Sequence, residues 1–226
     1  MFSCGIAAKQ MADKVNARIV SNGVKGEVHT YSVTDYAESV INAASGVYSD
    51  KAVNAVKAML NYGTAAQQYF GYNTDNPANS IMTDDDKNMD MVGFNTYTGK
   101  LVNADSVSGI SYYGSSLVLE SDTILRNYFE LSDGYSIDNY TFYVKDKDGN
   151  KNIIVPQKTD ASLYYIDISN VKAYELADNV NIYVQKNGDS EDKIMMLEYG
   201  AYVYARYVDK YLDNTALKNL MTAMYH

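Results

Sequence analysis

The chain has 226 residues, 46% of them apolar, which is enough to bury a sizeable core and indicates a globular rather than a disordered protein. Its 28 acidic and 19 basic residues give a net charge of -9 without any Lys/Arg cluster, which excludes nucleic acid as an expected partner. An anionic membrane surface would repel the chain for the same reason, and no apolar run approaches the roughly 18 residues of a membrane span, so membrane insertion is not expected.

The N-terminal thirty residues predict short strands. Phe2–Ala7 is apolar, and Val15–Val20 alternates apolar and polar residues as a half-buried strand does. The segment 8–13 between them is expected to form a corner. Asn22-Gly23 is a strong signal for a hairpin turn, so Glu27–Ser32 is expected to return alongside Val15–Val20.

Two helices are expected next. Apolar residues fall at helical spacing over Val33–Ile41, and Ser32 or Thr34 can cap this helix. A longer helix is expected over Asp50–Phe70, and Gly71 ends it. Small residues in its second half predict that another chain segment approaches closely there: Gly63, Ala65 and Ala66.

The middle of the chain changes character. Residues 73–106 are polar and contain several asparagines, which indicates a linker or a loosely packed loop. Beyond them, short strands at roughly ten-residue spacing predict an antiparallel sandwich. These strands are Gly109–Tyr113, Ser116–Glu120, Thr123–Glu130, Tyr140–Lys145, Lys151–Pro156 and Ser162–Ile168.

An internal duplication is the most informative feature of the sequence. The segment Met11–Asn16 matches Leu176–Asn181, and Asn22-Gly23 recurs as Asn187-Gly188, about 165 residues later. Further matches follow in the same order: 32–37 with 196–201, and 54–59 with 219–224. A corner, a strand, a turn, a second strand and two helices therefore recur, and six elements in one order are improbable by chance.

The duplication divides the chain into four segments. Residues 1–72 are expected to end a first repeat, with strands and a two-helix hairpin, and residues 73–106 form the linker or loop. Residues 107–195 are expected to form the β-sandwich of a second repeat, and 196–226 its helical hairpin, cut short. The predicted fold class is α+β: an antiparallel, Ig-like β-sandwich combined with helical hairpins and internally duplicated.

Three stretches of the chain resemble a known family: Ala55–Asn73, Gly114–Arg126 and Asn214–Met221. They are similar to a recurrent module of large secreted and surface-anchored proteins of gut Firmicutes such as clostridia, lachnospiraceae and ruminococci. The resemblance implies an extracellular location at the bacterial cell surface, beside Ig-like, leucine-rich or cell-wall-anchoring segments. It implies no catalytic residue.

Candidate catalytic and metal-binding groups are few. The histidines are His29, on an expected solvated strand, and the terminal His226, while Cys4 falls on the face of a predicted strand. A single cysteine excludes an internal disulfide and a thiolate metal cluster. Asp146–Asn150 is better explained as a hairpin turn than as a calcium-binding loop. Asp84–Asp86 is better explained as a solvated acidic run than as a calcium site. We therefore expect a protein that is not an enzyme and holds no cofactor or metal.

Binding is the function that remains. The chain has 23 Tyr and no Trp, and two tyrosine pairs are candidate binding residues: Tyr112-Tyr113 and Tyr164-Tyr165. Strand alternation turns only one residue of each pair outward. Three hypotheses follow: a module that recognises a host or bacterial protein, with immunoglobulin as one conceivable partner; a carbohydrate-binding module; and a structural spacer or stalk.

Overall fold

The structure, a computed structural model, describes residues 5–89, 107–119, 123–169, 171–172, 175, 180–189, 193–197 and 213–226. The chain forms two units, which we call the helical unit, Met1–Val92 with Asn214–His226, and the two-sheet unit, Gly93–Asp213. The fold is α+β, and every strand pair in the described residues is antiparallel.

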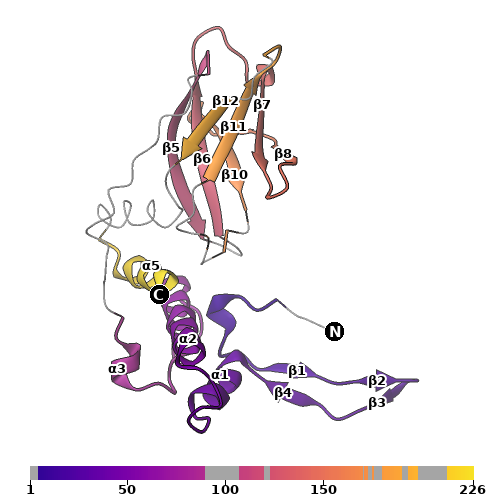
Figure 1. Ribbon diagram of the computed structural model, residues 1–226, viewed down its shortest axis with the longest axis vertical. Helices are drawn as coiled ribbons and strands as arrows, with labels where there is room; N and C mark the ends of the chain where they lie inside the picture. Colours follow the sequence, from indigo (N-terminus) through magenta and orange to yellow (C-terminus); the bar gives the residue numbers. More distant parts are fainter. Residues whose placement is uncertain are drawn as a thin grey trace. The chain divides into compact units, whose positions relative to one another are not determined.

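A narrow two-stranded hairpin projects from the helices of the helical unit (Figure 1). Its strands are β1 (Val15–Ala17) paired with β4 (His29–Tyr31), and β2 (Val20–Ser21) paired with β3 (Val24–Lys25). Asn22 and Gly23 form the turn with φ of 50° and 79°, the left-handed conformation that such a turn requires at both central residues. The hairpin expected from Asn22-Gly23 is therefore confirmed.

The strand expected over Phe2–Ala7 is wrong for Gly5–Ala7, which form no strand, while Phe2–Cys4 lie outside the described residues. The chain turns instead through a short 3-10 helix, η1 (Ala8–Gln10). The corner expected over 8–13 coincides with this turn.

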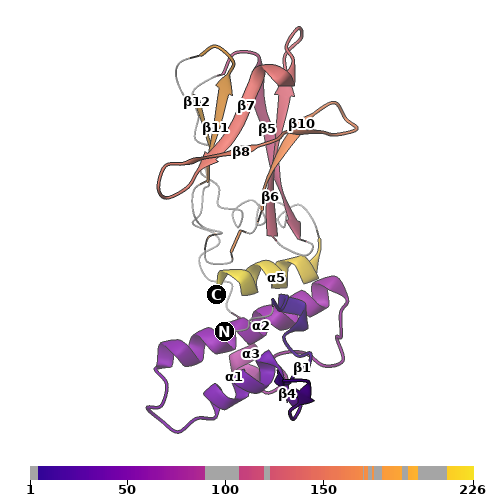
Figure 2. The ribbon, with the colours of Figure 1, turned by 90° about the vertical axis from the view of Figure 1, so that its right-hand side faces the viewer.

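Both expected helices of the first segment are confirmed at their predicted limits. Helix α1 (Val33–Ile41) begins with a capping box in which Ser32 and Asp35 each accept a backbone N–H of the other. Helix α2 (Asp50–Phe70) is capped by Ser49 and ends at Gly71, whose φ is 59°. The short helix α3 (Asp84–Lys87) follows. Helix α5 (Thr215–Tyr225), capped by Asn214, packs along α2 (Figure 2).

The core of the helical unit forms where α1, α2 and the residues after α2 meet. Its buried members are Ala12, Ala37, Leu60, Ala78 and Met82. Gly63 explains how closely these segments approach α2, because a Cβ built there would lie 3.0 Å from Ala78 Cβ and 3.3 Å from the Ala8 carbonyl oxygen. The close approach predicted from the small residues of this helix is confirmed.

The segment after α2 is an irregular loop apart from α3, but its described part is not loosely packed as expected over 73–106. Residues 73–89 pack on α2, and residues 90–106 lie outside the described ones. Gln67, which is 1% exposed, holds this segment: its Nε2 donates to the carbonyls of Asn73 and Asn76, and its Oε1 accepts from the backbone of Ala78. Because the buried side-chain amide of Gln67 has its donor and acceptor groups hydrogen-bonded, it stabilises this loop, which composition alone predicts to be loosely packed.

The two-sheet unit contains two four-stranded antiparallel sheets, ordered β5-β6-β10-β9 and β12-β11-β7-β8 (Figure 1). The strands are β5 (Ile110–Leu119), β6 (Thr123–Leu131), β7 (Tyr140–Lys145), β8 (Lys151–Ile154), β9 (Gln157–Lys158), β10 (Tyr164–Ile168), β11 (Val180–Lys186) and β12 (Lys193–Leu197). A 3-10 turn, η3 (Ile137–Asn139), precedes β7.

One apolar core joins the two sheets. It takes Phe129 and Ile166 from the first sheet, and Phe142, Ile182 and Val184 from the second, all 0% exposed. The rings of Phe129 and Phe142 meet with centroids 5.1 Å apart. Each such side chain stabilises the unit by roughly 1.5–3 kcal/mol relative to exposure.

The strands expected over Gly109–Tyr113 and Ser116–Glu120 prove to be a single strand, β5. Gly114 and Ser115, which lie between the two expected strands, stay paired with β6. An irregularity in this pairing shapes the surface described next.

Candidate binding surface

A β-bulge in β5 leaves Tyr113 as an unpaired residue on the outer side of the strand. Tyr112 pairs with Phe129 and Gly114 pairs with Tyr128, so Tyr113 is an extra residue without a partner in the register. A bulge of this kind redirects the side chain of the inserted residue and leaves the flanking ladder intact. Tyr113 is accordingly 65% exposed.

The same bulge places Tyr112 and Ser115 on the core side of β5, although a regular strand would put residues three apart on opposite faces. Ser115 donates from Oγ to Asn127 Oδ1 at 2.6 Å, so the 2.6 Å contact between Tyr112 and Ser115 has the tyrosine hydroxyl as donor. Asn127 is 0% exposed and donates to the carbonyl of Leu125. This buried polar chain fixes the backbone beneath Tyr113.

A row of side chains crosses the outer face of this sheet. Pairing aligns Gly114 with Tyr128, Tyr128 with Tyr165, and Tyr165 with Gln157. The two rings lie 6.1 Å apart and tilted, and the Tyr165 hydroxyl donates to Gln157 Oε1 at 2.9 Å. Gly114 has nothing within 4 Å of its Cβ position, so the surface beside Tyr128 is open.

An ion pair forms the next row. Arg126 on β6 donates from Nε and from one terminal nitrogen to the two carboxylate oxygens of Asp167 on β10, both at 2.8 Å. Its guanidinium carbon also lies 4.1 Å from the centroid of the Tyr165 ring. The hydrogen bonds that Arg126 donates to the Asp167 carboxylate raise the pKa of Arg126 above its ordinary value. Each side chain of the pair is 27% exposed, so this is a preformed, partly accessible contact.

We call this outer face the tyrosine–arginine face: Tyr113, Gly114, Ser116, Arg126, Tyr128, Gln157, Tyr165 and Asp167. Of the four tyrosines proposed from the sequence, it contains Tyr113 and Tyr165. Tyr112 packs against the core, and Tyr164 shares the core side of β10 with Ile166. One tyrosine of each pair therefore lies on the outer face, as strand alternation predicts.

Sequence reasoning missed Arg126, Tyr128 and Asp167. The i, i+2 spacing of Arg126 and Tyr128 in β6, and of Tyr165 and Asp167 in β10, places each pair on one side of its strand. Their meeting depends on the pairing of β6 with β10, which the spacing does not reveal.

Lysines cover two tyrosine rings on the outer face of the other sheet. Tyr143 and Tyr183 stack with centroids 5.0 Å apart, Lys145 lies 4.3 Å from the Tyr183 ring, and Lys151 lies 4.4 Å from the Tyr143 ring. Tyr143 is only 1% exposed. These rings are less accessible to a ligand than Tyr113.

The helical unit contains a pocket of about 430 Å³ lined largely by amide and hydroxyl side chains of α2, α5 and the 79–89 segment. Several of these groups bind the chain itself. Asn61 donates to the carbonyl of Asp86 and accepts from Asn79 Nδ2, and Thr64 accepts from the backbone of Asn79. The pocket is therefore a weaker candidate than the tyrosine–arginine face.

The other residues singled out from the sequence do not assemble. His29 is exposed on β4, His226 is the last residue, and Cys4 lies outside the described residues. Asp146 closes the β7–β8 hairpin by accepting from the backbones of Asp148 and Asn150, and hydrogen bonds from Asn150 lower its pKa. Asp84–Asp86 begin α3.

No three His, Cys, Asp or Glu side chains within the described ranges gather as a metal ion requires. None of the helices in that part of the chain combines the length and the apolarity needed to cross a bilayer.

Comparisons with known proteins add no assignment. A scan against protein-family models found no match to this chain, and neither did searches of the curated proteins and of the solved structures.

Proposed function

We propose that this chain is a non-catalytic, extracellular binding module of a bacterial cell-surface protein, and that its tyrosine–arginine face recognises a protein ligand. The observation that carries the proposal is the bulge that lifts Tyr113 to 65% exposure beside the Arg126–Tyr165 stack. Tyrosine and arginine are the residue types enriched at the energetic centres of protein interfaces.

The packing of Arg126 favours a protein over a sugar. A sugar ring stacks on a free aromatic face, but Arg126 already occupies one face of Tyr165 at 4.1 Å. The Tyr128 ring is tilted against Tyr165 with centroids 6.1 Å apart, and Tyr113 protrudes from the bulge. An arginine held by Asp167 and a protruding tyrosine offer a rigid contact with low entropic cost to a protein surface.

Two finer features of the fold belong to the same proposal. We propose that the two-sheet unit is an Ig-like sandwich, and that a hairpin and a helix recur as an internal duplication. Spacing supports the duplication: the turn residues Asn22 and Asn187, and the helix caps Ser49 and Asn214, are each 165 residues apart.

Binding assays with matched variants test the function. The intact chain is presented to immobilised serum proteins including immunoglobulins, and to a glycan array. For a protein ligand, Tyr113→Ser and Arg126→Met should each weaken binding by roughly 10- to 30-fold, the loss expected at an interface centre. Tyr36→Ser is the control, since Tyr36 is 48% exposed on α1 in the other unit.

The outcomes separate the candidate functions. Binding that both face variants leave unchanged, with their circular dichroism unaltered, would exclude the tyrosine–arginine face. Retention on glycans that is lost in Tyr113→Ser would replace the protein ligand by a carbohydrate. Silence in both assays, combined with rod-like tandem copies, would favour a spacer.

A further inference from the structure

The β1–β4 hairpin exposes an unusual amount of apolar surface. Ile19 is 80% exposed, Val24 71%, Val20 57% and Val28 55%. The ribbon has two strands, and no third strand pairs with it within the described residues. A two-stranded hairpin alone is marginally stable in water, and apolar exposure on this scale marks an interaction surface.

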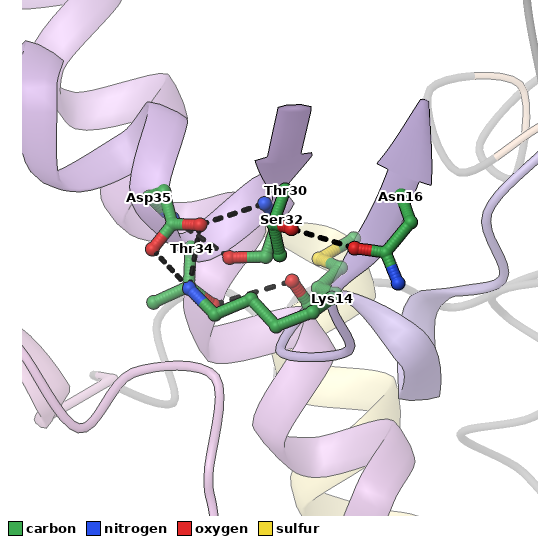
Figure 3. Close-up of polar contacts among 7 residues, drawn as sticks. Lys14, Asn16, Thr30, Ser32, Thr34 and Asp35 are labelled. Carbon is green, nitrogen blue, oxygen red and sulfur yellow. Dashed lines mark hydrogen bonds and ion pairs between the residues drawn. The ribbon is translucent and has the colours of Figure 1, made fainter. Parts of the chain in front are cut away.

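The root of the hairpin is nevertheless firmly held by the helical unit (Figure 3). Figure 3 shows Lys14 reaching the carboxylate of Asp35, with both Nζ–O distances at 2.6 Å. The backbone of Thr34 donates to the Met11 carbonyl at 3.1 Å. Asp13, next to Lys14, accepts from the hydroxyl of Tyr72 at 2.6 Å. The hairpin is therefore presented in a fixed direction while its apolar side chains remain uncovered.

The β11–β12 hairpin indicates what covers such a ribbon. Its first strand, β11, begins within the matching segment Leu176–Asn181, and the turn lies at Asn187-Gly188. Strand β11 pairs with β7. Through that pairing Ile182 and Val184 become 0% exposed in the core between the two sheets. At the spacing of 165 residues, Ala17 corresponds to Ile182 and Ile19 to Val184.

We propose that the β1–β4 hairpin is the closing hairpin of a second two-sheet unit, a further copy of the kind formed by β5–β12. Residues 18–21 pair with the strand of that unit that corresponds to β7, and Ala17 and Ile19 enter its core. The inference rests on the proposed duplication and is independent of the ligand of the tyrosine–arginine face. The partner must have this place vacant, because in the present chain β11–β12 fills it.

A chimera supplies such a vacant unit. Residues 107–169 are joined directly to Gly5 of the chain, so that the strands β5–β10 precede β1–β4 at the spacing of the duplication. Amide hydrogen exchange of residues 18–21 should slow by roughly 100-fold or more relative to the natural chain, as pairing with a third strand requires. A control chimera joins residues 107–197, with their own β11–β12, to Gly5 through a Gly/Ser linker, and should leave residues 18–21 exchanging fast.

Two variants of the first chimera test the predicted face. Ile19→Asp places a carboxylate where Val184 is fully buried and should abolish the slow exchange, while Val20→Asp, at the position of the half-exposed Gln185, should preserve it. In the natural chain both variants should exchange as the parent does. The proposal is overturned if the amides of residues 18–21 still exchange fast in the first chimera while the control chimera folds. It is also overturned if exchange slows equally in the control chimera, or if Ile19→Asp and Val20→Asp exchange at the same rate in the first chimera.

Discussion

Replacing Ser115 by alanine tests the buried polar chain that fixes the Tyr113 bulge. The Ser115 hydroxyl donates to Asn127 Oδ1 at 2.6 Å and accepts from Tyr112 at 2.6 Å. Its removal leaves the carbonyl oxygen of a 0% exposed asparagine without this donor. A buried acceptor stripped of its partner costs about 1–3 kcal/mol, so we expect a loss of about 2 kcal/mol.

Ser116→Ala is a closely matched control. It is the same substitution one residue further on, but Ser116 faces outward and its contact with the Tyr128 hydroxyl is longer, at 3.2 Å. A half-exposed hydroxyl can exchange its partner for water, so this variant should lose no more than about 0.5 kcal/mol.

Hydrogen exchange resolved by mass spectrometry on peptides covering β5 and β6 measures the difference locally, which matters in a chain with two units. A loss of about 2 kcal/mol corresponds to roughly 30-fold faster exchange in Ser115→Ala at unchanged intrinsic rates. Equal exchange in the two variants would refute the argument that the polar chain holds the bulge. Tyr113 would then owe its exposure to the strand pairing alone.

Further predictions concern the helical unit. Gly63→Ala should lower the thermal midpoint of the helical unit, measured by circular dichroism. Crowding of the new methyl group against Ala78 and the Ala8 carbonyl costs about 1–3 kcal/mol, which exceeds the helix-propensity gain of about 1 kcal/mol. Asn54→Ala, at an exposed position of the same helix, is the control and should raise the midpoint. Asp35→Asn should lower stability by about 0.5–1 kcal/mol at neutral pH by removing the ion pair with Lys14. Hydrogen bonds from Lys14 and Ser32 depress the pKa of Asp35 below 3.8, so its contribution is present above that pH and disappears as the pH falls through the lowered pKa. The urea midpoint should therefore change less between pH 7 and a pH below 3 in Asp35→Asn than in the control Glu38→Gln, whose carboxylate is exposed on the same helix. An equal change in the two variants would contradict the role given to the Asp35 ion pair.

Much of the local structure follows from the sequence. Helix α2 has its predicted limits, Asp50 and Phe70, and ends at Gly71 as expected, and the Asn22-Gly23 turn also forms as expected. These signals are short-range: a cap satisfies the N–H groups of its own first turn, and glycine or asparagine adopts the left-handed conformation without a distant partner. Strand β7 likewise matches its predicted limits, Tyr140–Lys145.

The candidate site, in contrast, depends on tertiary structure. Arg126 and Asp167 are 41 residues apart, and only the pairing of β6 with β10 joins them. The bulge at Tyr113 arises because β5 must keep its apolar residues toward the core while remaining paired with β6. The residues of β5 alone do not reveal this requirement. Composition marked residues 73–89 as loose, yet Gln67 binds three of their backbone groups. The sequence by itself determined the helix limits and the hairpin turns of the first segment, because those depend on neighbouring residues. Which side chains share a surface was decided by long-range burial and strand pairing.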